Sequence, residues 1–165
     1  MKRPTPIVPG PGQESVWDYP RPPSLEPTTR RVIVEWAGAT IADSVAAIRV
    51  CETSHPPTWA IPPTDTDTSL LRSADATSEC EWKGRARYWH LVLDDRRQEH
   101  AAWSYAEPRA GFEPIADHFF FYPARVDRCT VDGALVIPQE GGFYGGWITP
   151  NVVGPFKGPS GTLWW

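Results

Sequence analysis

Proline is the feature of this sequence that most limits what the chain can fold into. Nineteen of the 165 residues are prolines, roughly twice the usual share of about five per cent. Proline lacks a backbone N–H and its ring clashes with the preceding helical turn, so it interrupts helices and avoids central strands. We therefore expect a mainly β, turn-rich protein in which less than about 15% of residues are helical, against the usual third.

The two ends of the chain differ in composition from its middle. Residues 1–28 hold eight of the prolines, which predicts an extended N-terminal arm whose Trp17 and Tyr19 lie against the rest of the protein. Residues 138–165 combine seven of the thirteen glycines with six large aromatic side chains. A flexible linker would not carry so many aromatics, so we expect an irregular C-terminal arm that buries them on a central domain of residues 29–137.

Short runs with strand periodicity fill the central domain. Val32, Val34 and Trp36 share one face of an alternating segment, and Asp132-Gly133 is the dipeptide typical of a type I′ hairpin turn. Strands are expected at residues 31–36, 41–43, 47–52, 59–61, 86–93, 98–105, 119–122, 128–131 and 134–137. The pattern predicts a single compact antiparallel sheet domain, either open or barrel-like.

One short helical turn is expected between the N-terminal arm and residue 105. Thr64 or Asp65 can cap it, and it would carry Leu70 and Leu71.

Charge and targeting signals narrow the class of protein. The formal net charge of −4 disfavours nucleic acid as a partner, because binding to phosphate backbones needs an excess of Lys and Arg. No apolar run approaches the length of a signal peptide or of a membrane span, which favours a cytoplasmic protein without a membrane contact. The three cysteines cannot all pair, and we interpret them as free thiols.

Several blocks of this sequence resemble one known family. The blocks are residues 14–23 (ESVWDYPRPP), 52–57 (ETSHPP), 80–88 (CEWKGRARY), 101–105 (AAWSY), 121–122 (FY), 142–147 (GFYGGW) and 154–158 (GPFKG). Together they are similar to the domain of unknown function DUF427, and the resemblance covers nearly all of the chain from Glu14 to Trp165. The resemblance implies a compact β fold of the β-tent type, similar to the Mss4-like proteins and methionine sulfoxide reductase B.

Two kinds of bound group are not expected. Zinc sites use closely spaced ligand pairs such as Cys-x-x-Cys. In this sequence the pair that comes nearest to such a spacing is Cys51 and His55. The segment Gly154–Gly158 contains Gly and Lys but not the Gly-Lys-Ser/Thr order of a phosphate loop. We therefore predict no metal site and no cofactor.

The segment around residues 80–89 is the most informative for function. Lys83, Arg85 and Arg87 recur with period two and would share one face of a strand. They would repel one another unless a carboxylate or an anionic ligand lies near. Arg85 and Arg87 are compatible with a solvated face as well as with ligand binding, whereas Lys83, beside a glycine at the start of a strand, can be turned inward.

Three further side chains are candidates for chemistry. Cys80 is either an inert buried thiol or, with Lys83 three residues away, a reactive thiolate. Glu52 and His55 flank an irregular turn and could act as an acid and base pair. Alternatively, Glu52 pairs with an arginine and His55 with the backbone. A buried lysine needs a carboxylate, and we expect Lys83 to pair with Glu52.

These residues combine into one hypothesis about function. We predict one small-molecule pocket with catalytic Glu52, His55, Cys80 and Lys83, and with ligand-binding Arg85, Tyr88, Trp103, Tyr105 and Tyr122. If the protein is an enzyme, it would perform acid/base chemistry on a small carbonyl-like or anionic substrate. The alternative is a non-enzymatic module that binds an oligonucleotide or a peptide through the arginine-rich strand and exposed tryptophans.

Overall fold

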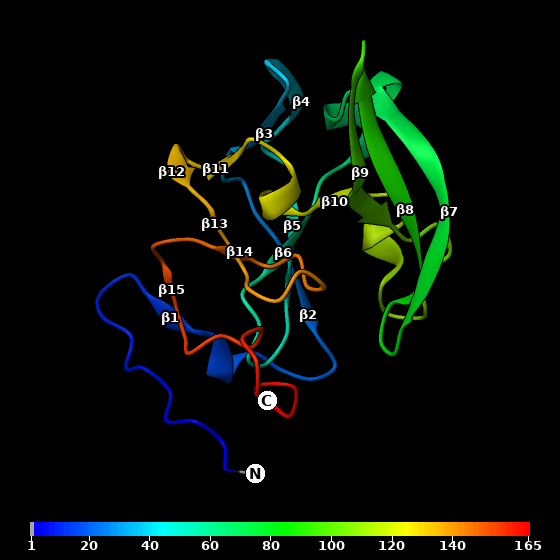
Figure 1. Cartoon of the computed structure of the whole chain (residues 1–165). Helices are drawn as coiled ribbons and strands as arrows, with labels where there is room; N and C mark the ends of the chain where they lie inside the picture. Colours follow the sequence, from blue (N-terminus) through cyan, green and yellow to red (C-terminus); the bar gives the residue numbers. More distant parts are fainter. Residues whose placement is uncertain (1) are drawn as a thin grey trace.

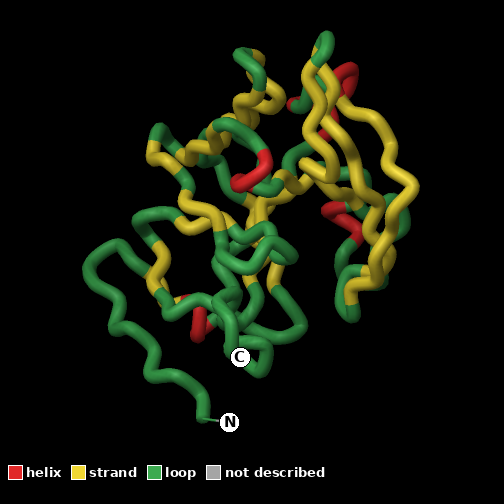
Figure 2. The backbone as a smooth tube through the Cα atoms, viewed as in Figure 1, coloured by secondary structure: helices red, strands yellow, loops and turns green. Residues whose placement is uncertain are grey.

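A computed structural model describes residues 2–165 of the chain, and β structure dominates it (Figure 1 and Figure 2). Strands and bridges take 44% of the residues, and the helical 9% consists of 3-10 turns. The predicted mainly β class and low helix content are confirmed.

The strands are β1 (Glu14–Ser15), β2 (Ser24–Pro27), β3 (Val32–Trp36), β4 (Ala39–Ser44), β5 (Ile48–Cys51), β6 (Thr58–Ala60), β7 (Leu71–Cys80), β8 (Gly84–Leu93), β9 (Arg96–Ser104), β10 (Phe120–Phe121), β11 (Arg128–Val131), β12 (Ala134–Leu135), β13 (Ile137–Pro138), β14 (Trp147–Ile148) and β15 (Val152–Val153). The 3-10 turns are η1 (Val16–Asp18), η2 (Pro63–Asp65), η3 (Thr68–Leu70), η4 (Glu113–Ile115) and η5 (Pro123–Arg125).

The largest sheet contains the three longest strands and has the order β10-β9-β8-β7. Its pairs are antiparallel, and it lies along one side of the molecule in Figure 1. The chain turns at residues 94–95 between β8 and β9, where Asp94 has a positive φ of 52°. This sheet supplies one wall of the cavity described below.

The sequence prediction fails at the start of this sheet. Of the two leucines expected in one helical turn, Leu70 lies in the turn η3 and Leu71 does not. Asp67 caps this turn by accepting a hydrogen bond from the Ser69 N–H. Leu71 begins β7, a strand that was not predicted. Most side chains of β7 are exposed, so it lacks the apolar alternation that marks a half-buried strand, and its pairing with β8 becomes visible only in the tertiary structure.

Two further sheets have the orders β12-β11-β3-β4 and β2-β5-β6. Their strands follow the predicted pattern more closely, except β2, which comes from the predicted N-terminal arm. Val32, Val34 and Trp36 are all buried. Asp132 and Gly133 have φ values of 47° and 80°, as a type I′ turn requires at both central positions. Within residues 2–165 the sheets remain open, so the barrel-like alternative is wrong. The β-tent likeness stays a prediction.

The N-terminal and C-terminal segments pair with each other. Strand β1 runs parallel to β15, and the rings of Trp17 and Trp165 lie 5.8 Å apart. Figure 1 shows the blue and red segments side by side at the bottom of the molecule. This parallel pair departs from the expected antiparallel arrangement.

The aromatic side chains of residues 138–165 are not all buried. Trp147 is fully buried, whereas Phe143 and Trp164 are each 64% exposed. The expectation that the C-terminal arm buries its aromatics is therefore wrong for these two side chains. Both lie in irregular segments outside the strands, and Phe143 contacts the Tyr144 ring edge-on, with the centroids 5.1 Å apart.

No helix within residues 2–165 is long and apolar enough to cross a membrane. Cys51 and Cys129 are buried and Cys80 is partly buried, and all three are free thiols, as predicted.

Candidate functional site

A cavity of about 330 Å³ opens between the sheet β7–β9 and the segments that face it. The sheet contributes side chains from β7, β8 and β9, and the opposite wall comes from β5, the loop after it and residues 139–157. Its lining includes Val50, Glu52, His55, Pro56, Thr58, Ser78, Glu79, Cys80, Glu81, Trp82, Lys83, Ala86, Tyr88, Trp103, Tyr105, Tyr122, Gln139, Phe143, Tyr144, Gly145 and Lys157. The volume is at the lower end of the range for small-molecule sites.

The structure brings together eight of the nine residues that the sequence singled out. They are Glu52, His55, Cys80, Lys83, Tyr88, Trp103, Tyr105 and Tyr122. Their roles in binding or catalysis stay predictions.

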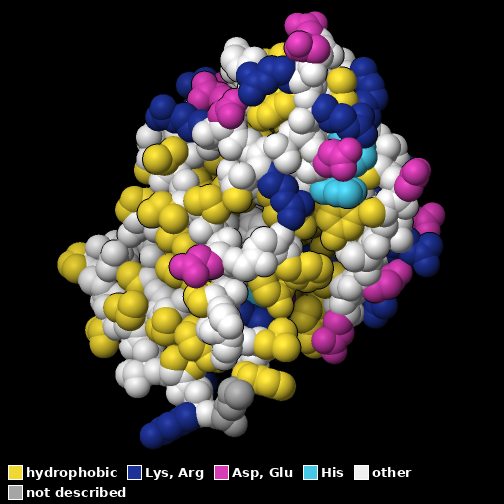
Figure 3. All heavy atoms as spheres, in the orientation of Figure 1, with side chains coloured by type: hydrophobic (Ala, Val, Ile, Leu, Met, Phe, Trp, Pro, Cys, Tyr) yellow, Lys and Arg dark blue, Asp and Glu magenta, His cyan; other side chains and the backbone are white. Residues whose placement is uncertain are grey.

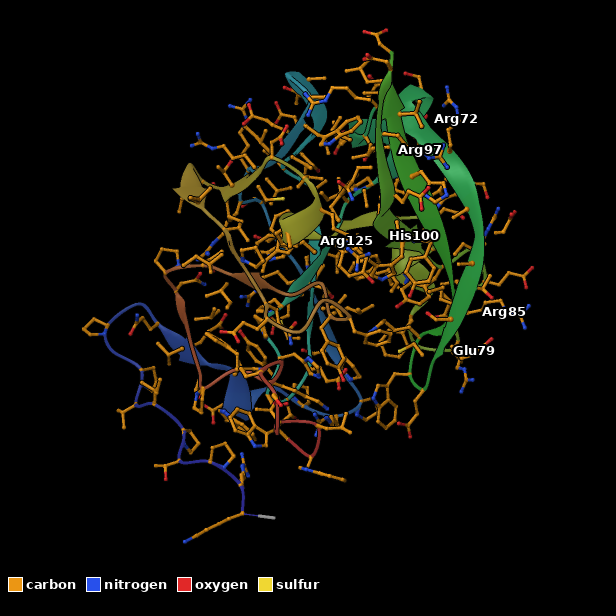
Figure 4. The ribbon with its side chains drawn as sticks, in the orientation of Figure 1. Arg72, Glu79, Arg85, Arg97, His100 and Arg125 are labelled. Carbon is orange, nitrogen blue, oxygen red and sulfur yellow. The ribbon has the colours of Figure 1, made fainter. Side chains whose placement is uncertain are left out.

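The ninth residue, Arg85, does not line the cavity. Its side chain is exposed and its Nε donates to Glu79 Oε1 at 3.0 Å. Figure 4 shows both residues at the outer edge of the β7–β8 hairpin, and the space-filling view in Figure 3 shows acidic and basic side chains along this edge. Its neighbours Gly84 and Ala86 are buried, so strand alternation directs Arg85 to the opposite face.

Glu52 follows β5 and has a different partner from the one expected. Its Oε2 lies 3.3 Å from Arg21 Nε, and no ion pair joins it to Lys83 within residues 2–165. The expected pairing with Lys83 is therefore wrong, and the alternative of an arginine partner is confirmed. Arg21 comes from the N-terminal arm, far from Glu52 in sequence, so no local pattern indicates the contact. The other oxygen, Glu52 Oε1, accepts no hydrogen bond from the described part of the chain.

His55 lies in the loop after β5, with a side chain only 13% exposed. Its Nε2 lies 3.6 Å from Glu52 Oε2, beyond hydrogen-bond distance, and its Nδ1 lies 3.1 Å from Gln139 Nε2. Burial, reinforced by the positive charges of Lys157, Arg21 and Lys83, lowers the pKa of His55 from 6.5 to about 3. The imidazole is therefore neutral at physiological pH and makes no true ion pair with Glu52.

Lys83 belongs to the turn between β7 and β8. Cys80 ends β7, and β8 begins at Gly84, directly after Lys83. The Lys83 carbonyl accepts from the Arg109 N–H at 3.0 Å, and Arg109 Nη1 also donates to the Glu81 carbonyl at 2.9 Å. These bonds hold the turn. The ammonium lies 5.9 Å from the centre of the Tyr105 ring and is near enough to His55 to lower its pKa, so Lys83 extends toward the cavity.

Aromatic side chains form the remaining wall. The Tyr88 hydroxyl lies 2.8 Å from Ser78 Oγ, and the Tyr122 hydroxyl donates to the Phe143 carbonyl at 3.2 Å. Burial raises the pKa of both Tyr105 and Tyr122 above the usual range, so these groups stay protonated. The Trp103 ring packs so closely on Gly145 that an added Cβ would lie 2.3 Å from it. Only glycine fits there.

Sequence reasoning missed two polar groups of the site, Gln139 and Lys157. Gln139 is 5% exposed and contacts His55. Burial and the charge of Arg21 lower the pKa of Lys157, and its ammonium donates to the Trp165 carbonyl at 3.3 Å. A single glutamine belongs to no sequence motif, and Lys157 lies in the segment Gly154–Gly158, which the sequence analysis did not assign to a ligand site. The many aromatic residues near both positions were the one sequence feature that could have indicated a pocket.

No group of three or more His, Cys, Asp or Glu side chains in residues 2–165 is arranged to hold a metal ion. The absence of zinc stays a prediction for elemental analysis.

The three thiols should differ in reactivity. Burial raises the pKa of Cys51 to about 12 and that of Cys129 further, whereas Cys80 lines the cavity and is only partly buried. In the native protein we expect iodoacetamide to modify Cys80 first, since both access and thiolate formation control alkylation. Mass spectrometry of the digested protein gives the order. Labelling of Cys51 or Cys129 at the rate of Cys80 would contradict this, and labelling in denaturant provides the control.

Comparison with known proteins identifies one match. Residues 24–132 match the model of a family described as a domain of unknown function, DUF427. No curated protein matches the chain.

Proposed function

The chain belongs to the DUF427 family, and we propose that its cavity binds a small organic anion and performs acid/base chemistry on it. The observation that carries this proposal is the set of charged groups around the neutral His55, whose side chain is 13% exposed. Lys83 and Lys157 line the same cavity, and Glu52, held by Arg21, is the one carboxylate within 4 Å of His55 in the described residues.

The charge balance of the cavity favours an anion. Glu79 and Glu81 also line the cavity, but Glu79 is paired with Arg85, and Glu81 is exposed, so solvent screens its charge. Lys83 and Lys157 pair with no Asp or Glu side chain in residues 2–165, and the Lys157 ammonium donates instead to the Trp165 carbonyl at 3.3 Å. A ligand carboxylate or phosphate between them would supply the missing countercharge in a partly desolvated site, where such contacts are stronger than in water.

The arrangement also supports proton transfer. Glu52 Oε1 is free to accept a proton, and neutral His55 can donate a hydrogen bond to a ligand oxygen. Both groups lie where a bound anion would meet them, since both line the same cavity. A positioned carboxylate acting as a base contributes about 10²–10⁴-fold to a rate.

The alternative, a module for single-stranded RNA or a peptide, would depend on Arg85 and Arg87. Arg85 is paired with Glu79, and Arg87 lies over the Trp89 ring at 5.4 Å. A salt titration with single-stranded RNA tests this alternative, which fails if no binding occurs at low salt.

Tryptophan fluorescence tests the proposed binding, because Trp82 and Trp103 line the cavity. Acetate, phenylacetate, 2-oxobutanoate and inorganic phosphate serve as probes. We expect at least one carboxylate to change the fluorescence saturably and Lys83→Ala to weaken its binding by about tenfold or more, equivalent to about 1.4 kcal/mol.

Arg87→Ala is the matched control, because it removes from the same hairpin a cation that does not line the cavity and that pairs with no carboxylate in residues 2–165. Its affinity should equal that of the wild type. The proposal fails if none of the four probes binds, or if Arg87→Ala weakens binding as much as Lys83→Ala.

A further inference from the structure

Gln139 makes a complete set of hydrogen bonds that determines how His55 is protonated. It follows β13, and its backbone N–H donates to the Gly146 carbonyl at 3.1 Å. In return the Gly146 N–H donates to Gln139 Oε1 at 3.1 Å. An N–H can only donate, so the amide oxygen must face Gly146, and the orientation of the amide follows from this bond.

The amide nitrogen of Gln139 then has two acceptors. One of its hydrogens goes to the Lys157 carbonyl at 2.7 Å, and the other points to His55 Nδ1 at 3.1 Å. His55 Nδ1 must therefore accept, and the imidazole carries its proton on Nε2. Gly146 makes this approach possible, because an added Cβ would lie 2.4 Å from Gln139 Oε1 and 2.6 Å from Pro56 Cγ.

With its proton on Nε2, His55 directs an N–H donor toward Glu52, the proposed base. His55 Nε2 faces Glu52, at 3.6 Å from Oε2, while Glu52 Oε1 has no partner in residues 2–165. A neutral imidazole N–H beside a carboxylate base is suited to stabilise a carbonyl oxygen that becomes negative as a neighbouring carbon loses its proton. Lys83 and Lys157 add a place for a carboxylate on the same molecule.

We propose that Gln139 is a positioning residue that holds His55 as the Nε2–H donor, and that the cavity enolises 2-oxo acids. Glu52 Oε1 removes a proton from the carbon next to the carbonyl. The C–H electron pair forms the C=C bond and the carbonyl π pair moves to oxygen, which His55 Nε2–H then stabilises. Return of a proton from Glu52 to carbon restores the ketone, so no other reactant is consumed. This inference rests on the proposed function, since the substrate is the bound anion.

Two measurements test the proposal with the full chain. The first is the ¹⁵N NMR spectrum of histidine-labelled protein at pH 7 without ligand, with His55 assigned by its absence in His55→Gln. We expect the Nε2–H tautomer in the wild type. In Gln139→Glu, the new carboxylate oxygen facing Nδ1 should bring the proton there. Gln139→Met, which removes the donor to His55 Nδ1 together with the acceptor of the Gly146 N–H, serves if Gln139→Glu does not fold.

The second measurement is deuterium uptake at C3 of 2-oxobutanoate in D₂O, followed by ¹H NMR. We expect catalysed exchange by the wild type and by Arg87→Ala, about 10²-fold or more loss in Glu52→Gln, and at least tenfold loss in Gln139→Glu. Binding of 2-oxobutanoate without exchange overturns this inference and leaves the proposed function standing. Absence of binding by any carboxylate or phosphate overturns both. An Nδ1–H tautomer in the wild type overturns the role of Gln139.

Discussion

Replacing Trp147 with alanine is expected to lower the free energy of unfolding by about 3–5 kcal/mol. Trp147 is fully buried, and its ring stacks on Trp59 with the centroids 5.8 Å apart. Its indole N–H donates to the Phe121 carbonyl at 3.0 Å and its backbone N–H donates to the Pro57 carbonyl at 2.8 Å. The alanine variant would leave a large cavity and an unpaired carbonyl, which add to the lost burial. Urea denaturation measures the effect.

Trp164→Ala is the matched control for this experiment. The same side chain type is removed from the same C-terminal segment, but from a position that is 64% exposed. We expect a change within about 0.5 kcal/mol. Equal destabilisation by the two variants would show that Trp147 does not link the C-terminal segment to the core as the structure indicates.

Lowering the pH from 7 to 5 should cost the protein about 2 kcal/mol of unfolding free energy through His55 alone. The pKa of this imidazole is about 3 in the folded protein and 6.5 when unperturbed. Between these values the unfolded chain takes up a proton that the folded chain does not. The contribution of His55 is therefore fully present above pH 6.5 and is lost progressively as the pH falls toward 3.

His55→Gln isolates this effect, because glutamine does not titrate and can still accept a hydrogen bond from Gln139. Urea denaturation at pH 7, 6 and 5 should show a smaller loss of stability in the variant by about 2 kcal/mol over this range. Parallel pH dependences of the two proteins would mean that His55 titrates normally. The window avoids ordinary carboxylates, which titrate near pH 4.

The sequence was a reliable guide wherever the deciding forces are local. Period-two alternation placed Val32, Val34 and Trp36 on a buried face, and Asp132-Gly133 specified a hairpin turn that needs two positive φ values. The high proline content predicted the low helix content, because a proline acts on its own neighbours in the chain. Strand β7 was not predicted, because its side chains are mostly exposed and its stability comes from pairing with β8.

For the site, the sequence selected the residue types and the tertiary structure decided their partners. Glu52, His55 and Lys83 stand in segments of irregular or turn-forming sequence, which is a local signal, and they do line one cavity. Arg85 was misassigned because its direction depends on which face of β8 is buried. The pairing of Glu52 with Arg21 and of His55 with Gln139 joins residues 31 and 84 positions apart. Ion pairs and hydrogen bonds depend on distance in space and not on separation in sequence. Arg21 and Gln139 come close to Glu52 and His55 only because both terminal segments fold onto the central sheets.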